Sequence, residues 1–211
     1  MITLKLLDSV AEIEKKVNTA IADLANTKIG NSRTEILQKC QSLISGWILS
    51  QPEIISLNSS SPDSLAGQFG LIPGQAASAT SSIINAIKDS ITVKIAKFNN
   101  KLQGGITVEF QPANFLNILN IPQGHTPIRG GDLHWMDWLL KRGDSIIIVN
   151  YQYDPKSGVG RSGLGHMIGG GAFRVPPQFS GTDTNNFITR ALIGQAQESE
   201  IAAIFRNVLG V

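Results

Sequence analysis

The beginning of the chain shows apolar residues at helical spacing. Around residues 9–25 they recur every three or four positions, which places them on one face of an α-helix. They are Leu6, Val10, Ile13, Val17, Ile21 and Leu24. Ser9 and Glu12 stand three residues apart where this pattern begins, and that spacing is typical of a capping box. The pattern therefore predicts an amphipathic helix.

A second helical pattern follows a break at Gly30-Asn31. Ser32, with a glutamate three residues later, predicts a new helix start, and Pro52 predicts its end because proline has no amide hydrogen to donate. The apolar positions in between share one helix face. They are Ile36, Leu37, Cys40, Leu43, Ile44, Trp47 and Ile48. Two helices joined by a short link pack in antiparallel, so we expect a helical hairpin over residues 1–50.

Residues 51–90 form a serine-rich arm that ends in a helix. A helical pattern covers residues 75–88, with isoleucines on its inner face. Before it, four apolar residues stand in a stretch punctuated by glycine and proline. They are Leu65, Phe69, Leu71 and Ile72. A free linker would not contain so many apolar residues, so we expect this segment to dock on its own chain or on a neighbour.

Period-two alternation begins after the arm. Apolar and polar residues alternate over 91–95 and again over 106–110, which predicts a β-hairpin with one buried face. The apolar run at 146–149 indicates a strand buried on both faces. Asp132 is expected to cap a short helix over 133–141. Residues 91–211 are thus predicted to form an α+β domain with a small, mostly antiparallel sheet, flanked by short helices and containing a glycine-rich loop.

Composition and charge narrow the classes of function. Hydrophobic residues make up 42% of the chain, but charged residues only 16%, and the formal net charge is +2. Soluble proteins average about 25% charged residues, so the low value indicates a surface that is polar but largely uncharged, or one that neighbours cover. No apolar run approaches the roughly 18 residues of a membrane span, and residues 1–7 are too short for a signal peptide. We expect no membrane contact and a protein that stays in the cytoplasm where it is made.

The glycine-rich loop contains the spacing of a dinucleotide-binding fingerprint. Gly158, Gly160 and Gly163 match G-x-G-x-x-G after a predicted strand. A fingerprint also needs a helix that opens at the third glycine and faces the pyrophosphate. The residues that follow, including Gly165 and three further glycines from 169, are unsuited to a helix start. We therefore interpret the loop as a connection between strands and expect no cofactor.

Residue types used in catalysis and metal binding are present without a recognisable arrangement. The histidines are His125, His134 and His166. Their spacing matches no zinc-ligand motif, so no metal site is expected. Ser162 lies outside a G-x-S-x-G elbow. A catalytic triad could be drawn from Ser162, one of His134 and His166, and one of Asp132 and Asp144. Many chains of this length allow such a drawing, so it is weak evidence for catalysis. The sequence therefore predicts no catalytic residues and no enzyme activity.

Aromatic and basic residues in the second half are candidates for an interface. Trp135 and Trp138 share a predicted helix face, which suits either the core or an anchor on a neighbouring subunit. Seven basic residues give this half a basic tendency, which favours a solvated surface or ion pairs between subunits over a nucleic-acid site. They are Arg129, Lys141, Arg142, Lys156, Arg161, Arg174 and Arg190.

An ordered set of segments resembles virion structural proteins of tailed bacteriophages. The set begins with GDLHWMDWLLKRGD at residues 131–144 and GRSG at 160–163, and continues with RVPPQFSG at 174–181 and NNFITRA at 185–191. LAGQFGL at 65–71 extends the similarity upstream. The resemblance is clearest over the C-terminal part of the chain.

This resemblance implies a structural role in a virion assembled in the bacterial cytoplasm. Neck, head–tail connector and tail-terminator proteins are small α+β domains that form rings through head-to-tail contacts. The expected partners are copies of this chain and neighbouring virion proteins, with passive contact to packaged DNA left open. The alternatives are a small hydrolase and a DNA-binding module. Candidate interface residues are Phe69, Leu71, Trp135, Trp138, Arg161, Arg174, Phe179 and Arg190.

Overall fold

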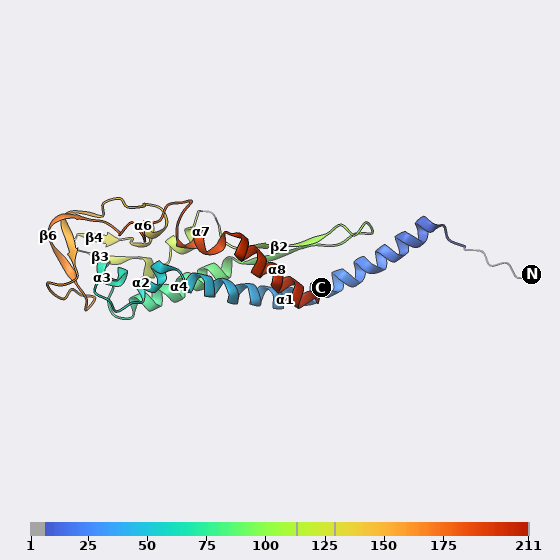
Figure 1. Cartoon of the computed structure of the whole chain (residues 1–211), viewed down its shortest axis with the longest axis horizontal. Helices are drawn as coiled ribbons and strands as arrows, with labels where there is room; N and C mark the ends of the chain where they lie inside the picture. Colours follow the sequence, from blue (N-terminus) through green and yellow to red (C-terminus); the bar gives the residue numbers. More distant parts are fainter. Residues whose placement is uncertain (1–6, 113, 129, 211) are drawn as a thin grey trace, which may run out of the picture. The chain divides into compact units, whose positions relative to one another are not determined.

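The computed structural model describes residues 7–112, 114–128 and 130–210 as an α+β fold (Figure 1). Leu6 and Arg129, used above, lie outside these residues. The described helices are accompanied by three antiparallel two-stranded sheets, which confirms the predicted fold class. None of these helices is long and apolar enough to cross a membrane.

Two compact units divide the chain, and each is assembled from separate segments. The first takes the described residues within 1–40, 91–109 and 200–211, and the second takes 41–90 and 110–199. This division differs from the expected series of consecutive segments at 1–50, 51–90 and 91–211.

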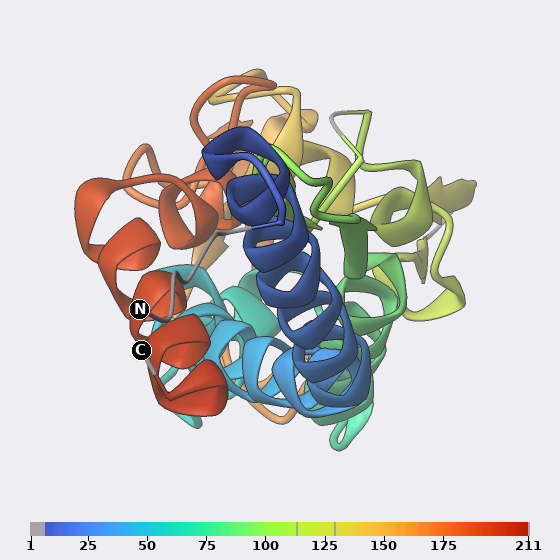
Figure 2. The same cartoon turned by 90° about the vertical axis from the view of Figure 1, so that its right-hand side faces the viewer.

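The predicted N-terminal helical hairpin is wrong. Residues Val10–Leu49 form one uninterrupted helix, α1 (Figures 1 and 2). Gly30 costs a helix interior only about 1 kcal/mol. Buried side chains on both sides of it, Ile29 and Ile36, stabilise the continuous helix by more than that. Ser32, the expected second cap, therefore lies inside α1.

The N-terminal cap of α1 is confirmed. The amide and the hydroxyl of Ser9 each donate to Glu12 Oε2 at 2.8 Å, and the Glu12 amide donates to Ser9 Oγ at 3.3 Å. This is the reciprocal geometry of a capping box. The hydrogen bonds from Ser9 stabilise the charged carboxylate and so lower the pKa of Glu12.

The first unit contains the predicted hairpin. Strands β1 (Thr92–Ala96) and β2 (Gly105–Glu109) pair in antiparallel, with Val93 opposite Val108. The hairpin is fastened to α1 by the amide side chain of Asn26, which donates to Phe98 O at 3.0 Å and accepts from Phe98 N at 2.8 Å. Asn26 thus bonds the backbone of Phe98 as a strand neighbour would.

The serine-rich arm folds into the second unit. It forms α2 (Pro52–Leu57), α3 (Leu65–Gln68) and α4 (Gln75–Ser90), and α4 confirms the helix predicted at 75–88. Leu65, Phe69 and Leu71 are buried, whereas Ile72 is exposed. The arm therefore docks on its own chain.

Short elements follow in the second unit. They are α5 (Leu116–Leu119), the 3₁₀ turn η1 (Pro122–Gly124), the paired strands β3 (Thr126–Ile128) and β4 (Gly131–Leu133), and α6 (Met136–Leu140). Asp132 belongs to β4, so its expected role as a helix cap is wrong. The helix begins at Met136, because residues 131–133 pair with β3 instead.

The last sheet pairs β5 (Ile148–Asp154) with β6 (His166–Phe173). The expectation of a strand buried on both faces at 146–149 is wrong. Ile146 precedes β5, both Ile146 and Val149 are exposed, and the hairpin lacks a third strand in the described chain. Helices α7 (Phe187–Leu192) and α8 (Gln195–Leu209) follow the sheet. Asn186 caps α7 through the amides of Ile188 and Thr189.

Candidate assembly surface

An apolar stripe runs along the first turns of α1, in the first unit. Val10, Val17 and Leu24 are spaced by seven residues and are 78%, 51% and 72% exposed. Ile21, beside them, is 48% exposed. We call these four residues the α1 stripe. A seven-residue repeat of apolar residues keeps one helix face toward a partner helix, and contiguous exposed apolar surface marks interaction sites.

Charges of both signs lie beside the α1 stripe. Lys16 Nζ lies 2.5 Å from Asp8 Oδ2, and Glu12, Glu14 and Lys15 are exposed within the same turns. Because the signs are mixed, a second copy of this helix can meet the stripe without bringing together charges of one sign.

Three of the eight candidate interface residues lie in the core of the second unit. Phe69, Leu71 and Trp135 are buried, and the rings of Phe69 and Trp135 stack with their centroids 5.4 Å apart. Their side chains therefore pack within the chain, and in this fold they are not accessible to a neighbouring subunit.

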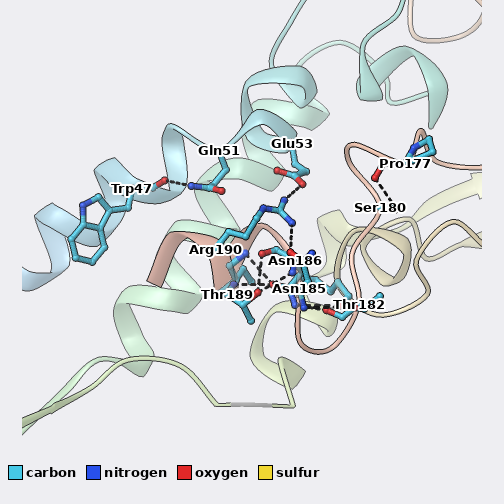
Figure 3. A network of polar contacts seen from close by, with 12 residues as sticks. Trp47, Gln51, Glu53, Pro177, Ser180, Thr182, Asn185, Asn186, Thr189 and Arg190 are labelled. Atoms are coloured by element: carbon cyan, nitrogen blue, oxygen red, sulfur yellow. Dashed lines mark hydrogen bonds and ion pairs between the residues drawn. The ribbon is translucent and has the colours of Figure 1, made fainter. Parts of the chain in front are cut away.

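Two of the candidate arginines are bonded inside the second unit. Arg190 forms an ion pair with Glu53, which is 0% exposed, and donates to Asn185 Oδ1 at 3.0 Å (Figure 3). Arg161 donates to Thr126 Oγ1 at 2.9 Å and to Gly70 O at 2.5 Å. Both guanidinium groups thereby connect segments distant in sequence.

The remaining three candidates lie at the surface of the second unit. Trp138 is half-buried, and the guanidinium of Arg142 lies 5.1 Å from its ring centroid. Arg174 is exposed and lies 4.0 Å from Asp144. Phe179 is half-buried. These residues stay candidates for contact with a neighbour.

A groove of about 490 Å³ in the second unit holds two of the residues considered for hydrolysis, Ser162 and His166. Its lining includes Ser162, His166 and Tyr153. The Ser162 hydroxyl accepts from Leu164 N at 3.2 Å, and no hydrogen bond joins it to a histidine within the described residues. Burial raises the pKa of Tyr153, whose hydroxyl donates to Pro62 O at 2.6 Å. The described residues of the groove thus show no hydrogen-bonded serine–histidine pair of the kind that a serine hydrolase uses.

The glycine-rich loop opens into strand β6, not into the helix that a dinucleotide fingerprint requires. Gly160 and Gly165 allow the backbone to lie close to itself. A Cβ atom added to Gly160 would lie 2.7 Å from Gly165 O, and one added to Gly165 would lie 2.4 Å from Asp154 O.

Two histidines that the sequence left apart are neighbours in the structure. His125, Asp132 and His134 offer ligand atoms that all lie within 4.8 Å of one another. An aspartate therefore lies beside two of the three histidines, a grouping that the comparison with zinc-ligand motifs did not predict. The D-x-H spacing at 132–134 was the available signal, since alternate residues of a strand share a face.

Comparison with protein-family models, curated proteins and solved structures finds no match for this chain.

The sequence analysis does not predict the α1 stripe as an interface, because the predicted helical hairpin places these apolar residues on its inside. The seven-residue spacing of Val10, Val17 and Leu24 was the signal that could have found it.

Proposed function

We propose that this chain is a structural subunit of a tailed-phage virion, in a ring at the neck or at the adjoining end of the tail. One observation supports the assembly contact. The α1 stripe exposes apolar residues that repeat every seven positions along one helix face. The position in a virion is supported by the resemblance of residues 131–191 to phage structural proteins.

A second copy of the chain is the occupant that suits the α1 stripe. The heptad spacing of Val10, Val17 and Leu24 is the pattern by which helices pack on one another. The mixed charges on the flanks also suit a neighbour of the same composition. In a ring, helices of neighbouring copies can pack side by side around the ring axis, so that each stripe contacts the helices of two neighbours.

Charging the stripe should break the assembly. In the double variant Val17→Lys/Leu24→Lys, two ammonium groups would have to be buried at the contact without partners, which opposes association strongly. We expect the wild-type chain to show a mass above that of one chain in light scattering and rings in negative-stain microscopy. The double variant should have the mass of one chain.

A matched control is Thr19→Lys/Thr34→Lys, which adds the same two charges at exposed positions of α1 outside the stripe. It should assemble like the wild type. A wild-type chain that has the mass of one chain at every concentration would contradict self-assembly. Equal disruption by both double variants would contradict the role of the stripe.

The virion assignment has a separate test. If the chain is a structural subunit, mass spectrometry should detect it in purified particles of the phage that encodes it. Its copy number per particle should equal the number of subunits in one ring. Its presence in infected cells together with its absence from purified particles would contradict the assignment and leave the self-assembly result intact.

A further inference from the structure

The β3–β4 hairpin brings two histidine rings close together. Its register pairs Thr126 with Leu133, so the next positions outward are His125 and His134. The ring centroids of these two histidines lie 3.8 Å apart. Asp132 lies two residues before His134 and therefore on the same face of the strand.

The two faces of this hairpin differ in character. Thr126 and Leu133 are buried, and Leu133 lines the groove that also holds Ser162. His125, Asp132 and His134 alternate with these residues and are half-buried or exposed. The imidazole and carboxylate groups thus gather on the face opposite to the groove, where an ion has access from solvent.

The ligand atoms are spaced nearly as a metal ion requires. His125 Nδ1 lies 3.0 Å from Asp132 Oδ2, and His134 Nε2 lies 3.7 Å from the same oxygen. In a tetrahedral site with bonds of about 2.0–2.1 Å, neighbouring ligand atoms are about 3.3–3.4 Å apart. Small side-chain rotations would therefore bring all three atoms onto one ion.

The backbone beneath these ligands is held in place. The carbonyl of His125 accepts from Gln75 Nε2 at 3.0 Å. Arg161 donates to the carbonyl of Pro127 and to Thr126 Oγ1. Ligands on a braced hairpin lose little conformational freedom when a metal binds, which favours binding.

We propose that His125, Asp132 and His134 bind a divalent transition-metal ion. Two imidazoles and a carboxylate suit zinc and its neighbours better than magnesium or calcium, which prefer oxygen ligands. Three protein ligands leave at least one coordination position to water or to a further ligand. The site is distinct from the α1 stripe, and metal binding does not depend on the proposed assembly.

Zinc binding to the untagged full-length chain tests the proposal. Equilibrium dialysis should give one zinc ion per chain for the wild type. The single variants His125→Ala, His134→Ala and Asp132→Asn should each lower the affinity at least about tenfold. The matched control His166→Ala, at the third histidine, should bind like the wild type. Zinc should also raise the thermal midpoint of the wild type and the control, because ligand binding stabilises the folded state.

Circular dichroism of each variant would show whether the fold is retained. If an alanine variant does not fold, His134→Gln provides a replacement of similar size at an exposed position, beside the conservative Asp132→Asn. A wild-type affinity no greater than that of the folded variants would overturn the proposal. So would an equal loss of zinc binding in His166→Ala.

Discussion

Replacing Trp135 with alanine should lower the free energy of unfolding by about 3–5 kcal/mol. The Trp135 side chain is 0% exposed and stacks on Phe69 in the core of the second unit. Its removal would take away a large apolar contact and leave a cavity that the neighbouring side chains fill only in part. Urea unfolding followed by tryptophan fluorescence measures the effect, because Trp47 and Trp138 also belong to the second unit.

Trp138→Ala is the matched comparison. Trp138 is half-buried, and its Nε1 donates to Ser145 O at 3.2 Å, so its loss should cost about 1 kcal/mol. The pair therefore separates a core residue from a surface residue of the same type. Equal costs for the two substitutions would show that Trp135 is not packed as described.

Arg190→Ala should be the second strongly destabilising substitution, with a cost of about 3 kcal/mol. It would leave the Glu53 carboxylate inside the second unit without its ionic partner. Removing one member of a buried ion pair costs about 3–5 kcal/mol. The lower end applies because the Arg190 side chain is 36% exposed and already partly hydrated. The same urea unfolding experiment measures the stability of the second unit, which contains both residues.

Two further variants isolate the cause. Arg174→Ala removes a surface arginine that lies 4.0 Å from Asp144, with both side chains well exposed. It should change stability by no more than about 0.5 kcal/mol. Adding Glu53→Gln to Arg190→Ala should recover part of the loss, because a neutral amide is less costly to bury than a charge. Additive effects of the two substitutions would refute the ion-pair explanation.

Local patterns predicted the elements whose signals lie within a few neighbouring residues. The Ser9–Glu12 cap was predictable because both partners belong to one helical turn. The β1–β2 hairpin was predictable from alternation, since Val93 and Val108 face each other in the register that this alternation favours. The helix predicted over 75–88 agrees with α4 because its isoleucines follow the helical period without interruption.

The sequence alone thus determined some of the helices and strands, such as α4 and the β1–β2 hairpin, since propensity, caps and alternation act over a few residues. Tertiary structure decided the rest. Burial of Ile29 and Ile36 outweighed the local cost of Gly30 and made α1 continuous. Packing on Phe69 placed Trp135 in the core and left Trp138 at the surface. These outcomes depend on contacts between residues far apart in the chain, and a one-dimensional pattern does not contain that information.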